Sequence, residues 1–215
     1  MACSLSAFPW LTPDEFDRAC RALAARCTSA RDGDGGWSMR LVTQGQQMAT
    51  SLKISRRVEV PSDATDAADL QEALEDDDPE ALVRTDLTPN LQIDYDIVLS
   101  PTYQVPVLYF ALRWNHCQGP VGLDAVYQYV VPEQYRKELK SVGIMGGISL
   151  GYHPESGAPA FFVHPCNTAD AMAQIADAQS VTPGTYLLIW LGLVGHGVNL
   201  HVPCELVISD GSRPS

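Results

Sequence analysis

The chain has 215 residues, 46% of them hydrophobic and 19% charged, which is an ordinary composition for a globular protein with a packed core. Its 26 acidic and 14 basic residues give a formal net charge of −12, which argues against nucleic acid or an anionic membrane as a partner. The longest apolar run, residues 186–195, is too short for a transmembrane segment. We interpret residues 1–215 as a single domain, and the lack of a secretory signal pattern favours a cytoplasmic location.

One acidic segment accounts for most of the net charge. Residues 61–90 hold ten acids and one base, whereas the rest of the chain is nearly neutral. Blocks of like charge repel one another and resist packing, so we expect a solvated loop inserted into the domain. The alternative is a docking surface for a basic partner.

Six cysteines are present without any C-x-x-C pair, in a chain too long and too poor in cysteine for a disulfide framework. We therefore expect reduced thiols, as in cytoplasmic proteins. The six are Cys3, Cys20, Cys27, Cys117, Cys166 and Cys204.

The first predicted element is a helix. Thr12 is a capping residue, Pro13 suits the first turn, and Glu15 occupies the capping-box position. Apolar residues then recur at helical spacing, which predicts that one face of this helix packs on the core. Its members are Phe16, Ala19, Cys20, Leu23 and Cys27.

Four strands are predicted next. Residues 37–43 and 48–60 precede the acidic segment, and residues 91–99 and 103–114 follow it with alternating or continuous apolar side chains. Successive strands of this kind favour an antiparallel meander.

The remaining part of the chain is mixed. It divides into helical patterns at 122–131 and 132–141, a loop at 141–159, a short strand at 160–163, a helix at 168–179 with Ala171, Met172, Ile175 and Ala176 on one face, and a buried helix or strand at 186–194. The predicted fold class is α+β, an antiparallel sheet with helices packed on one side.

Cys166 is the cysteine best placed for chemistry. Pro165 gives it an extended approach and Thr168 opens a helix, so the thiol lies at or just before a helix N-terminus. Unpaired amide groups at such an end favour the thiolate, which is the nucleophilic form. The glycine- and proline-rich stretch before it favours a surface position. The other interpretation is an inert cysteine at the boundary of an element.

Two blocks of sequence carry a resemblance. The first is Y-D-I-V-L-S-P-T-Y-Q-V-P-V-L-Y-F at 95–110, and the second combines Y-H-P at 152–154 with P-A-F-F-V-H-P-C-N-T at 159–168. With these blocks the chain resembles the ubiquitin-conjugating-like enzymes of autophagy, of the autophagy-related protein ten type. The resemblance covers residues 91–200 in patches, including Trp190-Leu191 and Val194-Gly195 of a C-terminal helix.

The resemblance implies a ubiquitin-conjugating-like fold and a thioester relay. Cys166 matches the family's catalytic cysteine, which accepts the C-terminal glycine of a ubiquitin-like modifier, autophagy protein twelve, from the activating enzyme, autophagy protein seven. The acyl group then passes to a lysine of the acceptor, autophagy protein five. The relay implies no cofactor and no metal.

Transfer to an amine needs donors for the developing oxyanion and a route for the lysine proton. No asparagine lies just upstream of Cys166, where ubiquitin-conjugating enzymes use one. His164 and Asn167 are candidates to substitute for it, and Tyr103 and Tyr109 could add hydroxyl groups. The alternatives are a histidine that only shapes the turn and tyrosines that only pack in the core.

Other functions compete with this one. His196, His201 and Cys204 are zinc-ligand types, but their spacing matches no common zinc pattern, so we predict no metal site. Cys166 with His201 as base and Asn199 as partner describes a cysteine hydrolase, the alternative enzyme class. A non-catalytic scaffold on the same fold is the third possibility.

Overall fold

The computed structural model describes residues 4–29, 37–44, 49–59, 90–114, 121–142, 147–177, 180–203 and 206. Residues 61–89 of the predicted acidic segment lie outside these residues, and so do Cys3, Cys117 and Cys204. The elements in chain order are α1 (Pro13–Ser29), β1 (Trp37–Gln44), β2 (Ala49–Glu59), β3 (Asn90–Leu99), β4 (Pro106–Trp114), α2 (Leu123–Ala125), a π-helical turn (Val126–Val130), α3 (Glu133–Val142), β5 (Ile148–Tyr152), β6 (Pro159–Val163), a 3₁₀ turn (Pro165–Asn167), α4 (Thr168–Ile175), α5 (Pro183–Val194) and a second 3₁₀ turn (Gly195–Val198).

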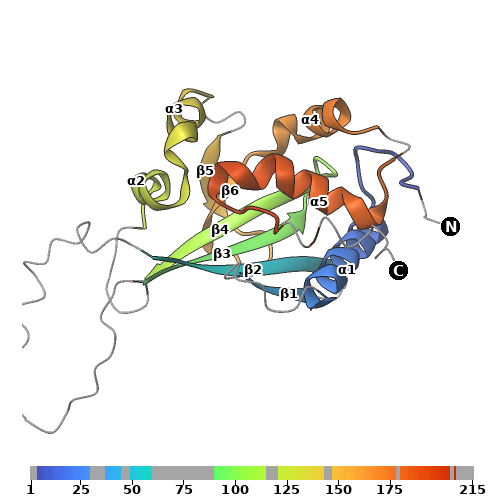
Figure 1. The fold of residues 1–215 in the computed structure, drawn as a ribbon, viewed down its shortest axis with the longest axis horizontal. Coiled ribbons are helices and arrows are strands. Elements are labelled where there is room, and N and C mark those ends of the chain that lie inside the picture. The colour runs from blue at the N-terminus through green and yellow to red at the C-terminus, as the bar shows by residue number, and fades with distance from the viewer. Residues whose placement is uncertain are drawn as a thin grey trace, which may run out of the picture.

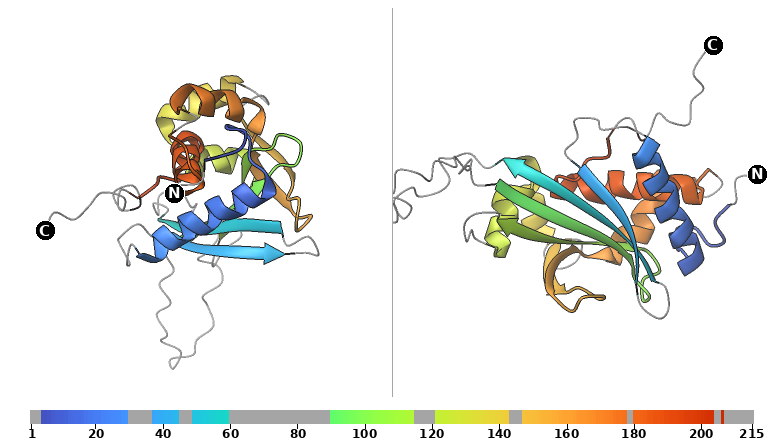
Figure 2. Two further views of the ribbon diagram at one scale, coloured as in Figure 1. Left: turned by 90° about the vertical axis from the view of Figure 1, so that its right-hand side faces the viewer. Right: turned by 90° about the horizontal axis from the view of Figure 1, so that it is seen from below.

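The strands form one six-stranded sheet in the order β1-β2-β3-β4-β6-β5, with every neighbouring pair antiparallel. Strands β1 to β4 are the predicted meander. The helices lie on one face of this sheet, with α1 and α5 crossing near its β1–β2 side (Figures 1 and 2). The predicted α+β class, an antiparallel sheet with helices on one side, is therefore confirmed.

The alternation of residue types in β3 separates the two faces of the sheet. Leu91, Ile93, Tyr95 and Ile97 are fully buried toward the helices. The residues between them, among them Asp94 and Asp96, point to the opposite face, because successive side chains of a strand alternate. Each large apolar side chain fully buried on the helical face contributes about 1.5–3 kcal/mol to folding.

Helix α1 packs on β1 and β2 and against α5. The predicted apolar face is buried at Phe16, Ala19, Cys20 and Leu23, whereas Cys27, in the last turn, is only half-buried. Residues 186–194, which periodicity did not assign, are helical in α5. No helix among the described residues has the length and apolar character needed to span a bilayer.

Two predictions for the second half of the chain are wrong in part. Residues 141–159 were expected to be a loop, but they contain β5, which pairs with β6 along its whole length. Gly151 does not interrupt the strand. It allows the ring of Phe162 to pack close to the backbone, because a Cβ added at Gly151 would lie 3.0 Å from that ring. The helix expected to reach residue 179 ends at Ile175, whose side chain is 57% exposed.

The predicted capping box at the start of α1 is present. Oε2 of Glu15 accepts hydrogen bonds from the amide and the hydroxyl of Thr12, each at 2.9 Å, and Oε1 accepts from the amide of Ser6 at 2.6 Å. In return the Thr12 hydroxyl accepts from the Glu15 amide at 3.3 Å. Burial by itself raises the pKa of Glu15, but the donors from Thr12 and Ser6 outweigh it and hold the pKa below its ordinary value.

Glu15→Gln should destabilise the protein by about 1–2 kcal/mol at neutral pH. Both carboxylate oxygens of Glu15 accept hydrogen bonds, whereas the NH₂ group of glutamine would face one of those donors and could not accept from it. A lowered pKa means that the carboxylate's contribution is complete above its unfolded pKa of about 4.3 and is lost as the pH falls through the folded value. Urea unfolding at several pH values measures this. A difference between the two proteins that stays constant from pH 7 to pH 3 would contradict the assignment.

Candidate active site

Strand β6 delivers the tripeptide His164-Pro165-Cys166. Phe161 points into the core and stacks on Phe110, with ring centroids 5.7 Å apart, whereas Phe162 points to the outer face beside Tyr109. The ladder ends here because Pro165 has no amide proton, and the chain turns into the short 3₁₀ element before α4 begins at Thr168. Cys166, which is half-buried, therefore lies two residues before the first residue of α4 and one before its N-cap Asn167, close to the predicted position at or one residue before the helix.

His164 caps the turn that carries the thiol. Its Nδ1 accepts a hydrogen bond from the backbone amide of Cys166 at 3.2 Å. Because Nδ1 is an acceptor, the proton of the neutral ring is assigned to Nε2, which is then a donor. This bond holds the histidine ring against the backbone of the cysteine turn.

Tyr103 lies edge-on to the ring of His164, with centroids 5.8 Å apart and planes at 79°. It was expected on a strand, but it occupies the turn between β3 and β4, because the strand begins only at Pro106. That turn is anchored: Gln104 has a φ of 54°, and its carbonyl accepts the amide of Leu11 at 2.8 Å. Tyr103 is 40% exposed and therefore faces the solvent beside the cysteine turn.

The other two candidate residues are placed differently. Asn167 follows Cys166 and is exposed, and its side chain makes no capping hydrogen bond to α4, so its amide is available to a substrate. Tyr109 is separated from His164 by the ring of Phe162, with centroid distances of 5.6 and 6.1 Å. Burial raises the pKa of Tyr109, which keeps it protonated at neutral pH. The structure thus brings together Cys166, His164, Tyr103 and Asn167, and leaves Tyr109 one ring away.

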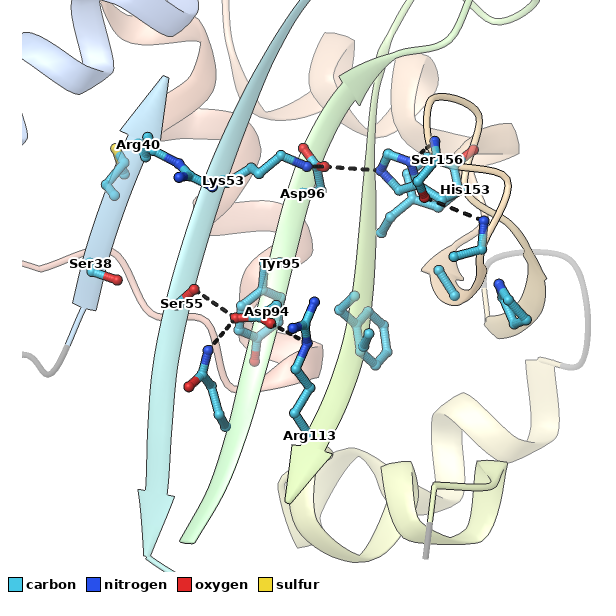
Figure 3. Close-up of a pocket in the computed structure, with 18 residues that line it drawn as sticks. Ser38, Arg40, Lys53, Ser55, Asp94, Tyr95, Asp96, Arg113, His153 and Ser156 are labelled. Atoms are coloured by element: carbon cyan, nitrogen blue, oxygen red, sulfur yellow. Dashed lines mark hydrogen bonds and ion pairs between the residues drawn. The ribbon is translucent and has the colours of Figure 1, made fainter. Parts of the chain in front are cut away.

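A polar cluster on the outer face of the sheet was not predicted. His153, which follows β5, is 7% exposed, and its Nε2 lies 3.0 Å from Oδ2 of Asp96 on β3 (Figure 3). Lys53 of β2 binds the same oxygen. The alternation in β3 was the one available signal, since it put Asp96 on the face away from the core, but nothing local in the sequence indicated its partner.

This cluster borders a groove of about 650 Å³ across the outer face. The acids along it are already paired, Asp96 with Lys53 and Asp94 with Arg113, Ser55 and Gln92. Both of these acids of β3 thus have a cation, although Oδ1 of Asp96 is buried without a hydrogen-bond partner.

Asp96, His153 and Glu155 bring ligand atoms within 4.8 Å of one another, which raises the question of a metal ion. The donor set does not fit one. Nδ1 of His153 accepts the amides of Glu155 and Ser156 at 3.2 and 3.3 Å, so the proton is on Nε2, the atom a metal would need. Metal-binding histidines have the reverse arrangement, donating from their second nitrogen.

Residues 15–205 match the family model described as autophagocytosis associated protein, active-site domain. The chain belongs to this family. Its membership confirms the resemblance drawn from the two sequence blocks around Tyr95 and Cys166.

Several proteins similar to this chain share a name. The ubiquitin-like-conjugating enzyme ATG10 of Gibberella zeae is 33% identical over 95% of this chain and 99% of its own length. The enzyme of the same name from Arabidopsis thaliana is 29% identical over 92% of this chain and 95% of its own length. The human one is 32% identical over 59% of this chain and 57% of its own length. The chain is accordingly a ubiquitin-like-conjugating enzyme of autophagy, a transferase.

Solved structures with the same name resemble the chain as well. The solution structures of KmAtg10 are matched over 90% of this chain and 99% of that one, with a TM-score of 0.41 and 16% identity. The crystal structure of the autophagic E2 Atg10 is matched over 87% and 98%, with a TM-score of 0.45 and 11% identity.

The hydrolase alternative finds no support in the geometry. The backbone carbonyl of Asn199 accepts from Arg56, and that of Val198 accepts from the Tyr95 hydroxyl, which fixes this segment on the helical side of the sheet. No hydrogen bond within the described part of the chain joins Asn199 or His201 to Cys166. His196 in turn packs against Tyr135, with centroids 4.9 Å apart.

The described cysteines differ in access, which predicts their reactivity. Cys20 is fully buried, and burial together with the charge of Asp17 raises its pKa far above the ordinary value. Burial also raises the pKa of Cys27. In the native protein, iodoacetamide should label Cys166 first and Cys20 only on unfolding, with Cys20 slowed by at least about tenfold. Peptide mass spectrometry measures this, and equal labelling of Cys20 and Cys166 would contradict the packing of α1.

Proposed function

We propose that this chain carries autophagy protein twelve as a thioester on Cys166, receives it from autophagy protein seven, and transfers it to a lysine of autophagy protein five. The observation that carries the proposal is the place of Cys166 in a half-buried, histidine-capped turn at the end of β6. The family membership and the sequence block around Cys166 support it. We also propose that the protein acts in the cytoplasm and needs neither metal nor cofactor.

In the charging step the Cys166 thiolate attacks the thioester carbonyl that links the modifier to the activating enzyme. A new C–S bond forms to Cys166, the old C–S bond breaks, and the activating enzyme leaves as a thiolate. The bond type is conserved, so the step needs no energy input beyond that stored in the incoming thioester. The proton that Cys166 loses goes to solvent or to the departing sulfur.

In the transfer step a neutral lysine amine attacks the thioester, an oxyanion develops, and the C–S bond breaks to release the Cys166 thiolate. The amine loses its proton as the isopeptide bond forms. We assign His164 the role of a donor and not of a base, because its Nδ1 already accepts from the Cys166 amide. Its Nε2–H, the Asn167 amide and the Tyr103 hydroxyl are the groups we propose for the oxyanion.

Cys166→Ser should convert the adduct from a reducible thioester to an oxyester that forms slowly and survives reductant, because serine is the weaker nucleophile and alkoxide the poorer leaving group. Cys166→Ala should abolish the adduct without unfolding the protein, since the side chain is only half-buried. The measurement is reconstitution with activating enzyme, modifier and ATP on a non-reducing gel. Cys27→Ala, another half-buried cysteine, is the matched control and should still charge.

A reductant-sensitive modifier adduct that persists in Cys166→Ala would falsify the site assignment. If the protein forms no adduct with any modifier but hydrolyses amide or ester substrates, the hydrolase class is favoured. A scaffold would do neither.

His164→Asn and His164→Ala separate the two roles of this ring. Asparagine is a good N-cap, so its oxygen can accept the Cys166 amide, whereas alanine leaves that amide without its partner. We expect Ala to cost about 1 kcal/mol of stability and Asn to cost little. Both should charge normally yet discharge to lysine about tenfold more slowly, because alanine has no donor and the NH₂ group of the shorter asparagine does not extend to the position of Nε2–H. Unfolding curves and pulse–chase discharge measure the two effects. Full rescue of discharge by Asn would reduce His164 to a cap.

A further inference from the structure

Strand β6, which leads to His164 and Cys166, has few backbone pairs with the meander. It pairs with β4 at only two positions, Tyr109 with Phe162 and Phe110 with Phe161, whereas it pairs with β5 at five. The β5–β6 hairpin therefore moves as a unit more easily than the meander does, unless something else fixes it. Since Cys166 and His164 follow β6 directly, any displacement of the hairpin displaces them.

The turn of this hairpin is built around His153. Its Nδ1 accepts the amides of Glu155 and Ser156, its backbone amide donates to Ala158 at 2.8 Å, and its carbonyl accepts from Gly157 at 2.9 Å. These bonds leave the ring in a single orientation, with Nε2 directed at the outer face of the sheet.

The ring reaches past β4, the edge of the meander nearest the hairpin, to Asp96 on β3. Nε2 lies 3.0 Å from Oδ2 of Asp96, a contact that is electrostatic and not a well-aligned hydrogen bond. Both side chains are about nine-tenths buried, and Lys53 holds the same carboxylate oxygen from β2 (Figure 3). The turn also touches β2 through Glu155, whose Oε2 accepts from the Ser51 hydroxyl at 3.4 Å.

A continuous row of rings connects this contact to the cysteine turn. His153 meets Tyr109 edge-on at 5.1 Å, Tyr109 meets Phe162 at 5.6 Å, and Phe162 meets His164 at 6.1 Å. The row crosses β4 and β6 on the outer face and ends at the ring that caps Cys166. Neighbouring rings of the row are in contact, which gives a route of packed side chains from Asp96 to the cysteine turn.

We propose that Asp96 and His153 form a latch that fixes the β5–β6 hairpin on the meander and thereby positions His164 and Cys166 for transfer. Both are positioning residues, because neither touches the reacting atoms. The consequence for transfer rests on the proposed function of Cys166, but the effect on the hairpin does not.

Asp94 supplies a matched control. It lies two residues from Asp96 on the same strand and the same face, and it has its own cation, Arg113 at 2.8 Å. Its partners Ser55 and Gln92 belong to the meander, and none of its described contacts reaches the hairpin. Asp94→Ala therefore removes the same chemical group and an ion pair, although one with a more exposed cation, without touching the latch.

The first measurement uses the protein alone. Hydrogen exchange followed by mass spectrometry should show the peptide over residues 159–163 exchanging at least about tenfold faster in Asp96→Ala than in Asp94→Ala. Asp96→Asn, which keeps an acceptor for Nε2, should restore part of the protection. His153→Asn keeps an acceptor for the turn amides but is too short to reach Asp96, so it should behave like Asp96→Ala.

The second measurement follows the thioester. Asp96→Ala and His153→Asn should charge at nearly the normal rate and discharge to lysine about tenfold more slowly, because transfer is the step that depends on placement. Asp94→Ala should do both normally. Should Asp96→Ala fail to fold, His153→Asn decides both measurements.

The outcomes separate the two proposals. Equal exchange of residues 159–163 in the Asp96 and Asp94 variants overturns the latch. Faster exchange with normal discharge overturns its role in positioning. Failure of the wild-type protein to form any thioester overturns the proposed function, while the exchange experiment still judges the latch.

Discussion

The short ladder between β4 and β6 is the constraint on which the position of Cys166 depends. The meander of β1 to β4 is held by long ladders and by a core under α1 and α5. The hairpin, in contrast, joins this body through two residue pairs and through the side chains of its two faces. Phe161 anchors it in the core, and Phe162 anchors it on the outer face.

The two faces of the sheet therefore contribute differently to the structure. The helical face buries large apolar side chains and supplies the free energy of folding. The outer face buries ions, and buried ion pairs contribute little net stability because desolvation offsets their attraction. The Asp96, His153 and Lys53 cluster is thus poorly explained as a source of stability. It is better explained by what it specifies, namely a single placement of the hairpin.

Much of the fold follows from local patterns. The parts that could not be predicted have one common cause. The period-2 alternation located β3 and β4, and the capping box at Thr12 and Glu15 located the start of α1, because each signal lies within a few adjacent residues. Strand β5 was missed because its glycine content is typical of loops, while its partner lies across a hairpin. The contact between Asp96 and His153 depends on the register of β4 against β6, which no local pattern contains. For the same reason, Tyr103 and His164 could be proposed from the sequence blocks, but not their ring contact.

The two histidines on either side of β6 solve one structural problem in the same way. Each precedes a proline, His153 before Pro154 and His164 before Pro165, so the next residue has no amide proton to offer. The first free amide lies two residues on, and in both turns Nδ1 of the histidine accepts it. This bond fixes the tautomer and leaves the proton on Nε2, which in His153 lies beside the Asp96 carboxylate and in His164 is a donor on the far side of the ring from the Cys166 amide. Because Nδ1 already accepts a hydrogen bond and Nε2 carries the proton, each ring can donate a hydrogen bond but has no free nitrogen to accept a proton. Neither histidine can therefore take the lysine proton in the proposed transfer while its turn is intact. In the transfer that we propose, the lysine proton therefore leaves to solvent or to a group other than these two histidines.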